Sequence, residues 1–253
     1  MNLHHLVRRW RQRQKITLTD LTAVPLHFLT HSPVERYRVA QYGDEREALQ
    51  AFLGQIRPDD VVFDIGASVG LYAIAAATKL PQGRLVAFEP DPETRAALQK
   101  NVALNQLTNV QFVPWAVSDR AGSVTLYSDG VAGRAPTLAQ QTRRHAPQGK
   151  ITVPTQTLDE AIARSELPLP TVLKIDIEGA ELLCLRGCQR LLAGEFGPRP
   201  RVIMLELHPL FLPDFGGTAV ETRTLLETIG YAPVWQQLRD DQEHLCYTVI
   251  GNQ

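Results

Sequence analysis

Along most of the chain, short apolar runs alternate with segments whose apolar positions recur at helical spacing. Runs rich in β-branched and aromatic residues predict strands, and the segments between them predict helices. The predicted strands are residues 61–65, 84–88, 110–117, 123–127, 171–177 and 201–207, with two more within 231–250. The predicted helices are residues 71–79, 92–104, a short helix after Thr157, 180–192 and 221–229. This alternation predicts an α/β domain with a parallel sheet covered by helices on both faces.

Residues 1–58 lack this alternation, and we expect them to be helical. Within them, residues 45–56 place apolar side chains at helical spacing, so this helix should dock on the main domain before Pro58 ends it. Basic residues gather around Trp10, namely Arg8, Arg9, Arg11, Arg13 and Lys15. They could contact a membrane surface or RNA, but the thin apolar face favours a solvated terminal helix. The prediction is a helical N-terminal extension at 1–58 that packs on a domain spanning 59–253.

Charge and cysteine content argue against several kinds of partner. The formal net charge is −1 and the pI is near 6.7, so no overall field recruits nucleic acid or an anionic membrane. No apolar run approaches the ~20 residues that cross a bilayer, and residues 1–15 lack the apolar core of a secretory signal. Cys184 and Cys188 lie four apart in a helical pattern, where buried apolar packing is favoured over a metal pair. We expect a reducing, cytoplasmic environment.

A glycine-containing loop follows the first strand of the predicted domain. It reads Asp64-Ile-Gly66-Ala-Ser68-Val-Gly70 and opens a helix. Gly66 lets the chain turn tightly and a ligand approach the backbone, and Gly70 lets the helix pack closely on the sheet. Free N–H groups at the helix start suit a negatively charged group, and Ser68 of this loop is a candidate contact of the cofactor.

The spacing of this loop distinguishes between two classes of cofactor. Nicotinamide enzymes use G-x-G-x-x-G to admit a pyrophosphate, whereas this loop has D-x-G-x-x-x-G with an acid at the strand end. Asp64 would repel a pyrophosphate but suits a cationic amino group. Glu89 ends the second strand, 19 residues after Gly70, about where an acid accepts both hydroxyls of a ribose. A nicotinamide-dependent oxidoreductase is therefore the disfavoured alternative.

Six segments together match a known pattern: VFDIGA at 62–67, AFEP at 87–90, AVSD at 116–119, TLD at 157–159, KIDIEGAE at 174–181 and LEL at 205–207. With these segments the chain resembles the FkbM-type family of class I S-adenosylmethionine-dependent methyltransferases, over roughly residues 59–210. The resemblance implies a Rossmann-like fold with a mostly parallel seven-stranded sheet. It also implies methyl transfer from S-adenosylmethionine to a hydroxyl of a small metabolite or glycan. By analogy with class I enzymes, Ala116, Val117 and Ser118 would cradle the adenine.

Charged residues at the ends of the fourth and fifth strands are the catalytic candidates. Asp176 ends the fourth strand, Lys174 lies two residues earlier on the same face, and Glu206 and His208 end the fifth. The two strand ends are adjacent in this topology, so Asp176, Glu206 and His208 should converge near the transferred methyl group. Asp176 or His208 could act as general base towards the acceptor hydroxyl.

Two alternatives remain open for this cluster. Asp176 and Glu206 could hold a Mg²⁺-like ion that lowers the pKa of the acceptor oxygens. In a structural interpretation, Lys174 and Asp176 form an ion pair, and Glu178 and Glu181 are charges at a helix N-terminus. N-methylation and a cofactor-binding module without catalysis are the further functional alternatives.

Residues 128–150 are rich in glycine and proline and carry no regular pattern. A structureless stretch of that length in a compact domain is usually functional or mobile. We expect a lid over the acceptor, with basic residues that could meet an acidic or phosphorylated group; a solvated surface loop is the alternative. These basic residues are Arg134, Arg143, Arg144 and His145.

Overall fold

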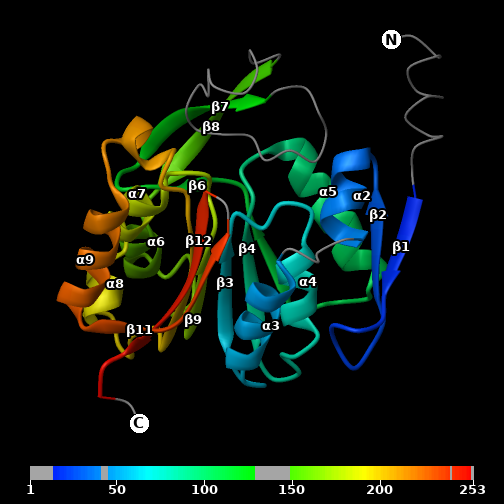
Figure 1. The fold of residues 1–253 in the computed structure, drawn as a ribbon, viewed down its shortest axis with the longest axis horizontal. Helices are drawn as coiled ribbons and strands as arrows, with labels where there is room; N and C mark the ends of the chain where they lie inside the picture. Colours follow the sequence, from blue (N-terminus) through cyan, green and yellow to red (C-terminus); the bar gives the residue numbers. More distant parts are fainter. Residues whose placement is uncertain (1–13, 41–44, 129–148, 240, 252–253) are drawn as a thin grey trace.

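A seven-stranded sheet forms the centre of the computed structural model, which describes residues 14–40, 45–128, 149–239 and 241–251 (Figure 1). The strand order is β11-β12-β10-β9-β3-β4-β5. The strands are β3 (Val61–Ile65), β4 (Arg84–Phe88), β5 (Val110–Val113), β9 (Val172–Ile175), β10 (Val202–Leu207), β11 (Tyr231–Arg239) and β12 (Gln242–Val249). Neighbours from β10 to β5 pair in parallel, and β12 runs antiparallel to β10 and to β11. The predicted mostly parallel sheet is confirmed.

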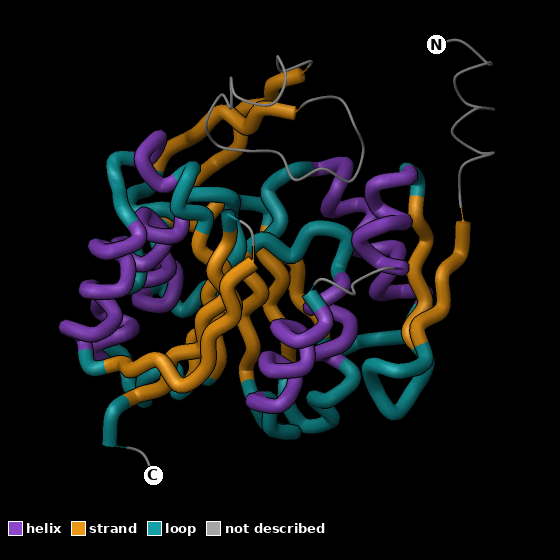
Figure 2. The backbone as a smooth tube through the Cα atoms, viewed as in Figure 1, coloured by secondary structure: helices purple, strands orange, loops and turns teal. Residues whose placement is uncertain are grey.

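Helices cover both faces of this sheet, as Figure 2 shows. The helices are α3 (Arg46–Gln55), α4 (Leu71–Ala77), α5 (Pro92–Leu104), α6 (Leu158–Ala163), α7 (Glu181–Arg186), α8 (Gln189–Ala193), α9 (Ala219–Ile229) and a 3₁₀ turn at Leu212–Phe215. The side chains of successive strand residues lie on opposite faces of the sheet, in two apolar clusters. Val62 belongs to the cluster that includes α3, α4 and α5, and Phe63 to the cluster that includes α6, α7 and α8. The near-continuous apolar strands follow from burial on both faces.

The N-terminal extension differs from the helical prediction. Its described part begins with a hairpin, β1 (Gln14–Leu18) and β2 (Leu26–Thr30), before α2 (Pro33–Ala40) and α3. Alternate residues of β2 are buried, which is the period of a strand. Asn101 of α5 accepts the backbone N–H of Leu29 at 2.7 Å, and Asn105, which follows α5, accepts that of His27 at 2.8 Å. Side chains from the end of α5 thus accept hydrogen bonds that a neighbouring strand would otherwise accept from β2. The local sequence of the extension does not reveal these distant partners.

The helix expected at 45–56 is confirmed as α3, and its apolar face is buried. Ala48, Leu49 and Phe52 belong to the same apolar cluster as Val62 of the central sheet. Of the basic cluster, Lys15 is exposed on β1, and the residues before position 14 lie outside the described residues.

Two further predicted elements are divided in the structure. The strand expected at 110–117 breaks into β5 and β6 (Ala116–Val117), and β6 joins a separate sheet of order β6-β8-β7. That sheet contains the predicted extra strand, β7 (Gly122–Ser128), and an unpredicted one, β8 (Gly149–Gln156). The helix expected at 180–192 is interrupted at Gly187, which separates α7 from α8. A Cβ at Gly187 would lie 2.0 Å from the carbonyl oxygen of Ser118, so this position requires glycine.

Other features of the described residues bear on the remaining predictions. Cys184, Cys188 and Cys246 are free and buried, as the apolar interpretation requires. Within the described ranges, no helix has the length and apolarity that a membrane span requires. The candidate lid at 128–150 lies almost entirely outside the described residues; its ends belong to β7 and β8.

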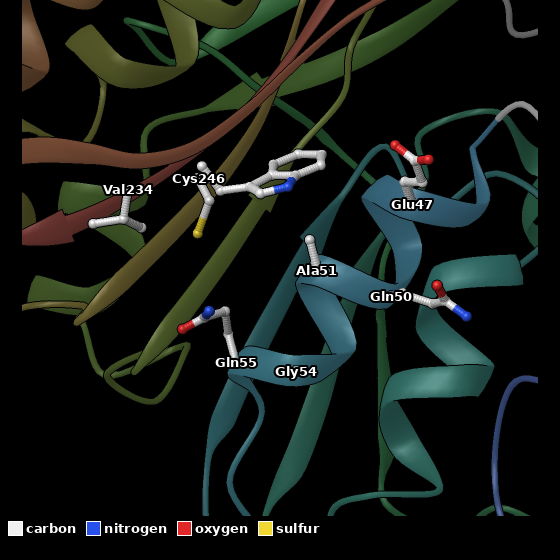
Figure 3. A pocket seen from close by; sticks show the side chains of 8 residues that line it. Glu47, Gln50, Ala51, Gly54, Gln55, Val234 and Cys246 are labelled. Atoms are coloured by element: carbon white, nitrogen blue, oxygen red, sulfur yellow. The ribbon is translucent and has the colours of Figure 1, made fainter.

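A cavity of about 600 Å³ lies between α3 and the hairpin formed by β11 and β12. Figure 3 shows Ala51 and Gly54 of α3 facing Cys246 across it. None of the residues that the sequence predicts for the functional site lines this cavity.

Candidate active site

The glycine loop turns back against the end of β9. Gly66 has a φ of +87° and Gly70 a φ of +101°, values that favour glycine. A Cβ at Gly66 would lie 1.9 Å from the carbonyl oxygen of Asp176, and one at Gly70 would lie 2.6 Å from Leu98 of α5. The tight turn predicted at Gly66 is therefore present, and the approach of a ligand to its backbone stays a prediction. At Gly70 the nearest side chain belongs to α5 rather than to the sheet.

Glu89 ends β4 beside this loop and is buried. Its Oε2 accepts the backbone N–H of Ser68 at 3.0 Å, and its Oε1 accepts that of Asp91 at 3.0 Å. Burial raises the pKa of Glu89 to about 7, against the lowering effect of these N–H groups. Each carboxylate oxygen retains a second lone pair. Glu89 can therefore accept two further hydrogen bonds when it is ionised.

Lys174 lies between two aspartates at the ends of neighbouring strands. Its Nζ is 3.1 Å from Asp64 Oδ1, 3.3 Å from Asp176 Oδ2 and 4.8 Å from the ring centre of Tyr72. Burial would lower the pKa of Lys174, but the charges of the two aspartates hold it above its ordinary value. Burial raises the pKa of Asp64, opposed by Lys174. Asp64 is wholly buried against Lys174, which is not the open position expected for a group that binds a cofactor directly.

Asp176 is the accessible member of the predicted catalytic set. Its side chain is 28% exposed, compared with 5% for Lys174, 9% for Glu206 and 2% for His208. Burial alone would raise the pKa of Asp176, but Lys174 and His208 together hold it below its ordinary value. An ionised carboxylate therefore faces the outside of the cluster.

His208 and Glu206 lie beside Asp176 and are more deeply buried than it is. The Nδ1–H of His208 donates to Glu181 Oε1 at 2.8 Å, while Nε2 lies 3.6 Å from Glu206 Oε1 and 3.7 Å from Glu178 Oε2. Burial would lower the pKa of His208, but Glu181 and Glu178 raise it to about 10. Burial and the charge of Asp176 place the pKa of Glu206 well above its ordinary value.

The predicted convergence of Asp176, Glu206 and His208 is confirmed. Each offers one ligand atom, and these atoms all lie within 4.8 Å of one another. The parallel pairing of β9 with β10 produces this proximity. The catalytic and metal-binding roles predicted for these residues are not decided by proximity and stay predictions.

The residues predicted to cradle adenine belong to the small sheet. Ala116 and Val117 form β6, which pairs with β8, and Ser118 donates its N–H to the Gln156 carbonyl at 3.0 Å. The side chains of Ala116 and Val117 are buried, so the backbone and Ser118 are the groups left to face a ligand.

Several residues near the cluster were not predicted from the sequence. Arg38 of α2 lies 4.0 Å from Glu178, and Arg239 of β11 lies 3.6 Å from Glu45. No motif marks these residues, because they lie on elements outside the matched segments. His244 lies 3.7 Å from Glu206; the antiparallel register of β10 with β12 places the two directly opposite each other.

The order of the seven strands is that of the Rossmann-like class I methyltransferase fold. The fold is similar to that of an rRNA methylase from Streptococcus thermophilus, with a TM-score of 0.51, 8% identity, and coverage of 81% of this chain and 96% of that chain. At that identity the likeness shows the fold alone.

Sequence comparison assigns the family. Residues 64–233 match the methyltransferase FkbM domain. The chain is 27% identical over 191 residues to the hexuronic acid methyltransferase AglP of Haloferax volcanii, covering 76% of this chain and 74% of AglP. It is 29% identical over 209 residues to the 31-O-demethyl-FK506 methyltransferase FkbM of Streptomyces tacrolimicus, covering 72% and 76%. The chain belongs to the FkbM methyltransferase family and is an S-adenosylmethionine-dependent methyltransferase.

Removing the Lys174 ammonium should destabilise the fold strongly. In Lys174→Met, Asp64 and Asp176 lose their shared cation, and we expect the free energy of unfolding at pH 7 to fall by about 3–5 kcal/mol. The double variant Asp64→Asn/Lys174→Met removes the uncompensated buried charge and should recover at least about 1 kcal/mol of this loss. Urea denaturation measures the free energy of unfolding of both variants. A Lys174→Met variant as stable as the wild type would show that Lys174 does not stabilise the fold through Asp64 and Asp176.

Proposed function

We propose that this protein transfers the methyl group of S-adenosylmethionine to a hydroxyl oxygen of a small metabolite or glycan, and that Asp176 contacts the acceptor. The partial exposure of Asp176 beside a buried charged cluster carries this proposal. The similarity to a hexuronic acid methyltransferase and to a methyltransferase of a demethyl-FK506 supports an oxygen-rich acceptor. N-methylation stays the alternative within the class.

The residues at the carboxyl edge of β3 and β4 fit the cofactor. When bound, S-adenosylmethionine supplies an electrophilic methyl group on a sulfonium centre. The free lone pairs of Glu89 suit the two hydroxyls of a ribose, and Gly66, Ser68 and Gly70 shape the loop beside it. Asp64 acts through Lys174, to which it is paired at 3.1 Å. We retain Ala116, Val117 and Ser118 as candidates for the adenine side.

Asp176 would orient the acceptor for an in-line displacement. A carboxylate held in one position can accept the hydrogen bond of an incoming hydroxyl and so point a lone pair of the acceptor oxygen at the methyl carbon. The same carboxylate can take up the hydroxyl proton as the oxygen is methylated. Lys174 contacts Asp176 directly at 3.3 Å. Glu206 and His208 lie behind it, and their burial makes them supporting groups rather than contacts of the acceptor.

A labelling experiment tests the function and the role of Asp176 together. A lysate incubated with the protein and isotopically labelled S-adenosylmethionine should yield products whose mass and fragmentation identify an O-methyl group. Asp176→Asn keeps the shape but removes the charge, and we expect the rate to fall about a hundredfold or more while cofactor affinity changes little. The exposed Asp214→Asn serves as control. Labelled N-methyl products, or an undiminished rate in Asp176→Asn, would contradict the proposal.

The affinity for S-adenosylmethionine should depend on pH through Glu89. Because burial raises the pKa of Glu89 to about 7, the ionised form that accepts the ribose hydroxyls is lost as the pH falls through 7. We expect the calorimetric Kd to weaken about tenfold per pH unit below 7 and to level off above 8. Glu89→Ala should weaken binding at least tenfold and remove this dependence; Glu227→Ala, on an exposed part of α9, is the control. Equal affinity at pH 6 and pH 8 in the wild type would contradict the raised pKa, and unchanged affinity in Glu89→Ala would remove Glu89 from the cofactor site.

A divalent cation at Asp176, Glu206 and His208 is the second candidate for the chemistry. One observation favours it. The buried Nε2 of His208 has no hydrogen-bond partner among the described residues, and ligand atoms of the three residues all lie within 4.8 Å of one another. Carboxylate ligands suit Mg²⁺ or Mn²⁺, and the imidazole also admits a softer ion. Such an ion would bind the acceptor oxygen and lower its pKa.

The two candidates predict different responses to a chelator. With a resident cation, methyl transfer should stop in excess EDTA and return when Mg²⁺ or Mn²⁺ is added. With Asp176 alone orienting the acceptor, the rate should not change. Elemental analysis of the chelated protein must accompany the rate measurement, and full activity in demonstrably metal-free protein would exclude the cation.

A further inference from the structure

Glu181 is a buried acid that the chemistry above leaves without a role. It begins α7, and its side chain is 0% exposed. Its Oε1 accepts the N–H of Gly179 at 2.8 Å and the Nδ1–H of His208 at 2.8 Å. Its Oε2 is buried and has no hydrogen-bond partner among the described residues. A carboxylate so placed is costly, because each buried polar atom without a partner loses its hydration.

The turn before Glu181 is shaped to bring it to His208. Glu178 has a φ of +53° although it is not glycine, and Gly179 follows with a φ of +104°. A Cβ at Gly179 would lie 2.6 Å from Phe211, so only glycine fits. Backbone of this kind is unfavourable by itself and persists where the surrounding structure requires it. The unfavourable backbone at Glu178 and Gly179 therefore directly precedes the buried carboxylate of Glu181 that binds His208.

The ring of His208 is held on two sides. Glu181 binds Nδ1, and the ring of Phe211 stacks on the imidazole at 5.9 Å with an interplanar angle of 16°. Since a carboxylate only accepts, the contact at 2.8 Å requires that Nδ1 carry the proton. Nε2 then points away from Glu181, into the gap beside Asp176 and Glu206.

We propose that Glu181 is a positioning residue for methyl transfer: it fixes the imidazole of His208 so that Nε2 faces Asp176 and Glu206. This inference rests on the proposed function of the site. It holds for both candidates, because a histidine that supports a carboxylate and one that binds a metal are each oriented by a hydrogen bond at the other nitrogen. Glu181 therefore acts through His208, without contact with the acceptor.

Glu181→Gln keeps the size and one acceptor oxygen but removes the charge. We expect kcat for labelled methyl transfer into the lysate acceptor to fall about thirtyfold, with the KM and calorimetric Kd for S-adenosylmethionine unchanged. His208→Asn should lower kcat further, and the double variant should be no slower than His208→Asn alone, because both changes interrupt one connection. Additive losses in the double variant, or an unchanged kcat in Glu181→Gln, would overturn the proposal.

A structural carboxylate provides the matched control. Asp159 accepts the backbone N–H groups of Arg190 and Leu191 at the start of α8, at 3.1 and 2.9 Å. Asp159→Asn should lower the free energy of unfolding without changing kcat. If Asp159→Asn and Glu181→Gln reduce kcat to the same extent, the effect of Glu181 is only structural and the proposal fails.

NMR of the ¹⁵N-histidine-labelled protein tests the contact independently of turnover. The His208 signals, assigned with His208→Asn, should show a protonated Nδ1 in the wild type and should shift in Glu181→Gln but not in Asp159→Asn. An unprotonated Nδ1 would overturn the proposal whether or not methyl transfer is found. A wild type that transfers no methyl group while showing the expected His208 signals would instead contradict the proposed function.

Discussion

The Lys174 ammonium between Asp64 and Asp176 is the interaction on which the site depends. It joins the ends of β3 and β9 at the edge where the glycine loop turns. Gly66 can approach the carbonyl of Asp176 only because it has no side chain, and Lys174 Nζ also lies 3.4 Å from the carbonyl oxygen of Gly66. One buried charge therefore positions the loop, the two strand ends and the partly exposed carboxylate of Asp176.

Around this ion pair, charges of both signs come from elements far apart in the sequence. Glu178 and Glu181 precede and begin α7, Glu206 ends β10, Arg38 comes from α2, and Glu45 pairs with Arg239 of β11. In a low dielectric each of these charges shifts the pKa of its neighbours. The N-terminal extension thereby contributes side chains to the electrostatics of a site built on the central sheet.

Local rules account well for the elements that carry their own signals. The side chain of Asp91 caps the predicted helix at 92–104 by accepting the N–H of Thr94 at 2.7 Å. Thr157 caps α6 in the same way, accepting the N–H of Glu160 at 3.0 Å. Elements that depend on distant partners were missed. The hairpin of β1 and β2 is held by Asn101 and Asn105, more than 70 residues away in the sequence. Strand β8 pairs with β6 and β7, and residues 129–148 separate it from β7.

The sequence by itself determined the fold class, the family and the set of charged residues at the strand ends, because apolar periodicity and motif spacing are local properties of the chain. Only the tertiary structure decided which of those residues are buried, which are accessible and which contact one another. It buried Asp64, Lys174 and His208 and left Asp176 partly exposed. It also bound Glu181 to His208 across 27 residues of sequence. Burial and the distance between charges set the protonation and accessibility of each group, and both arise only when the strands and helices pack together.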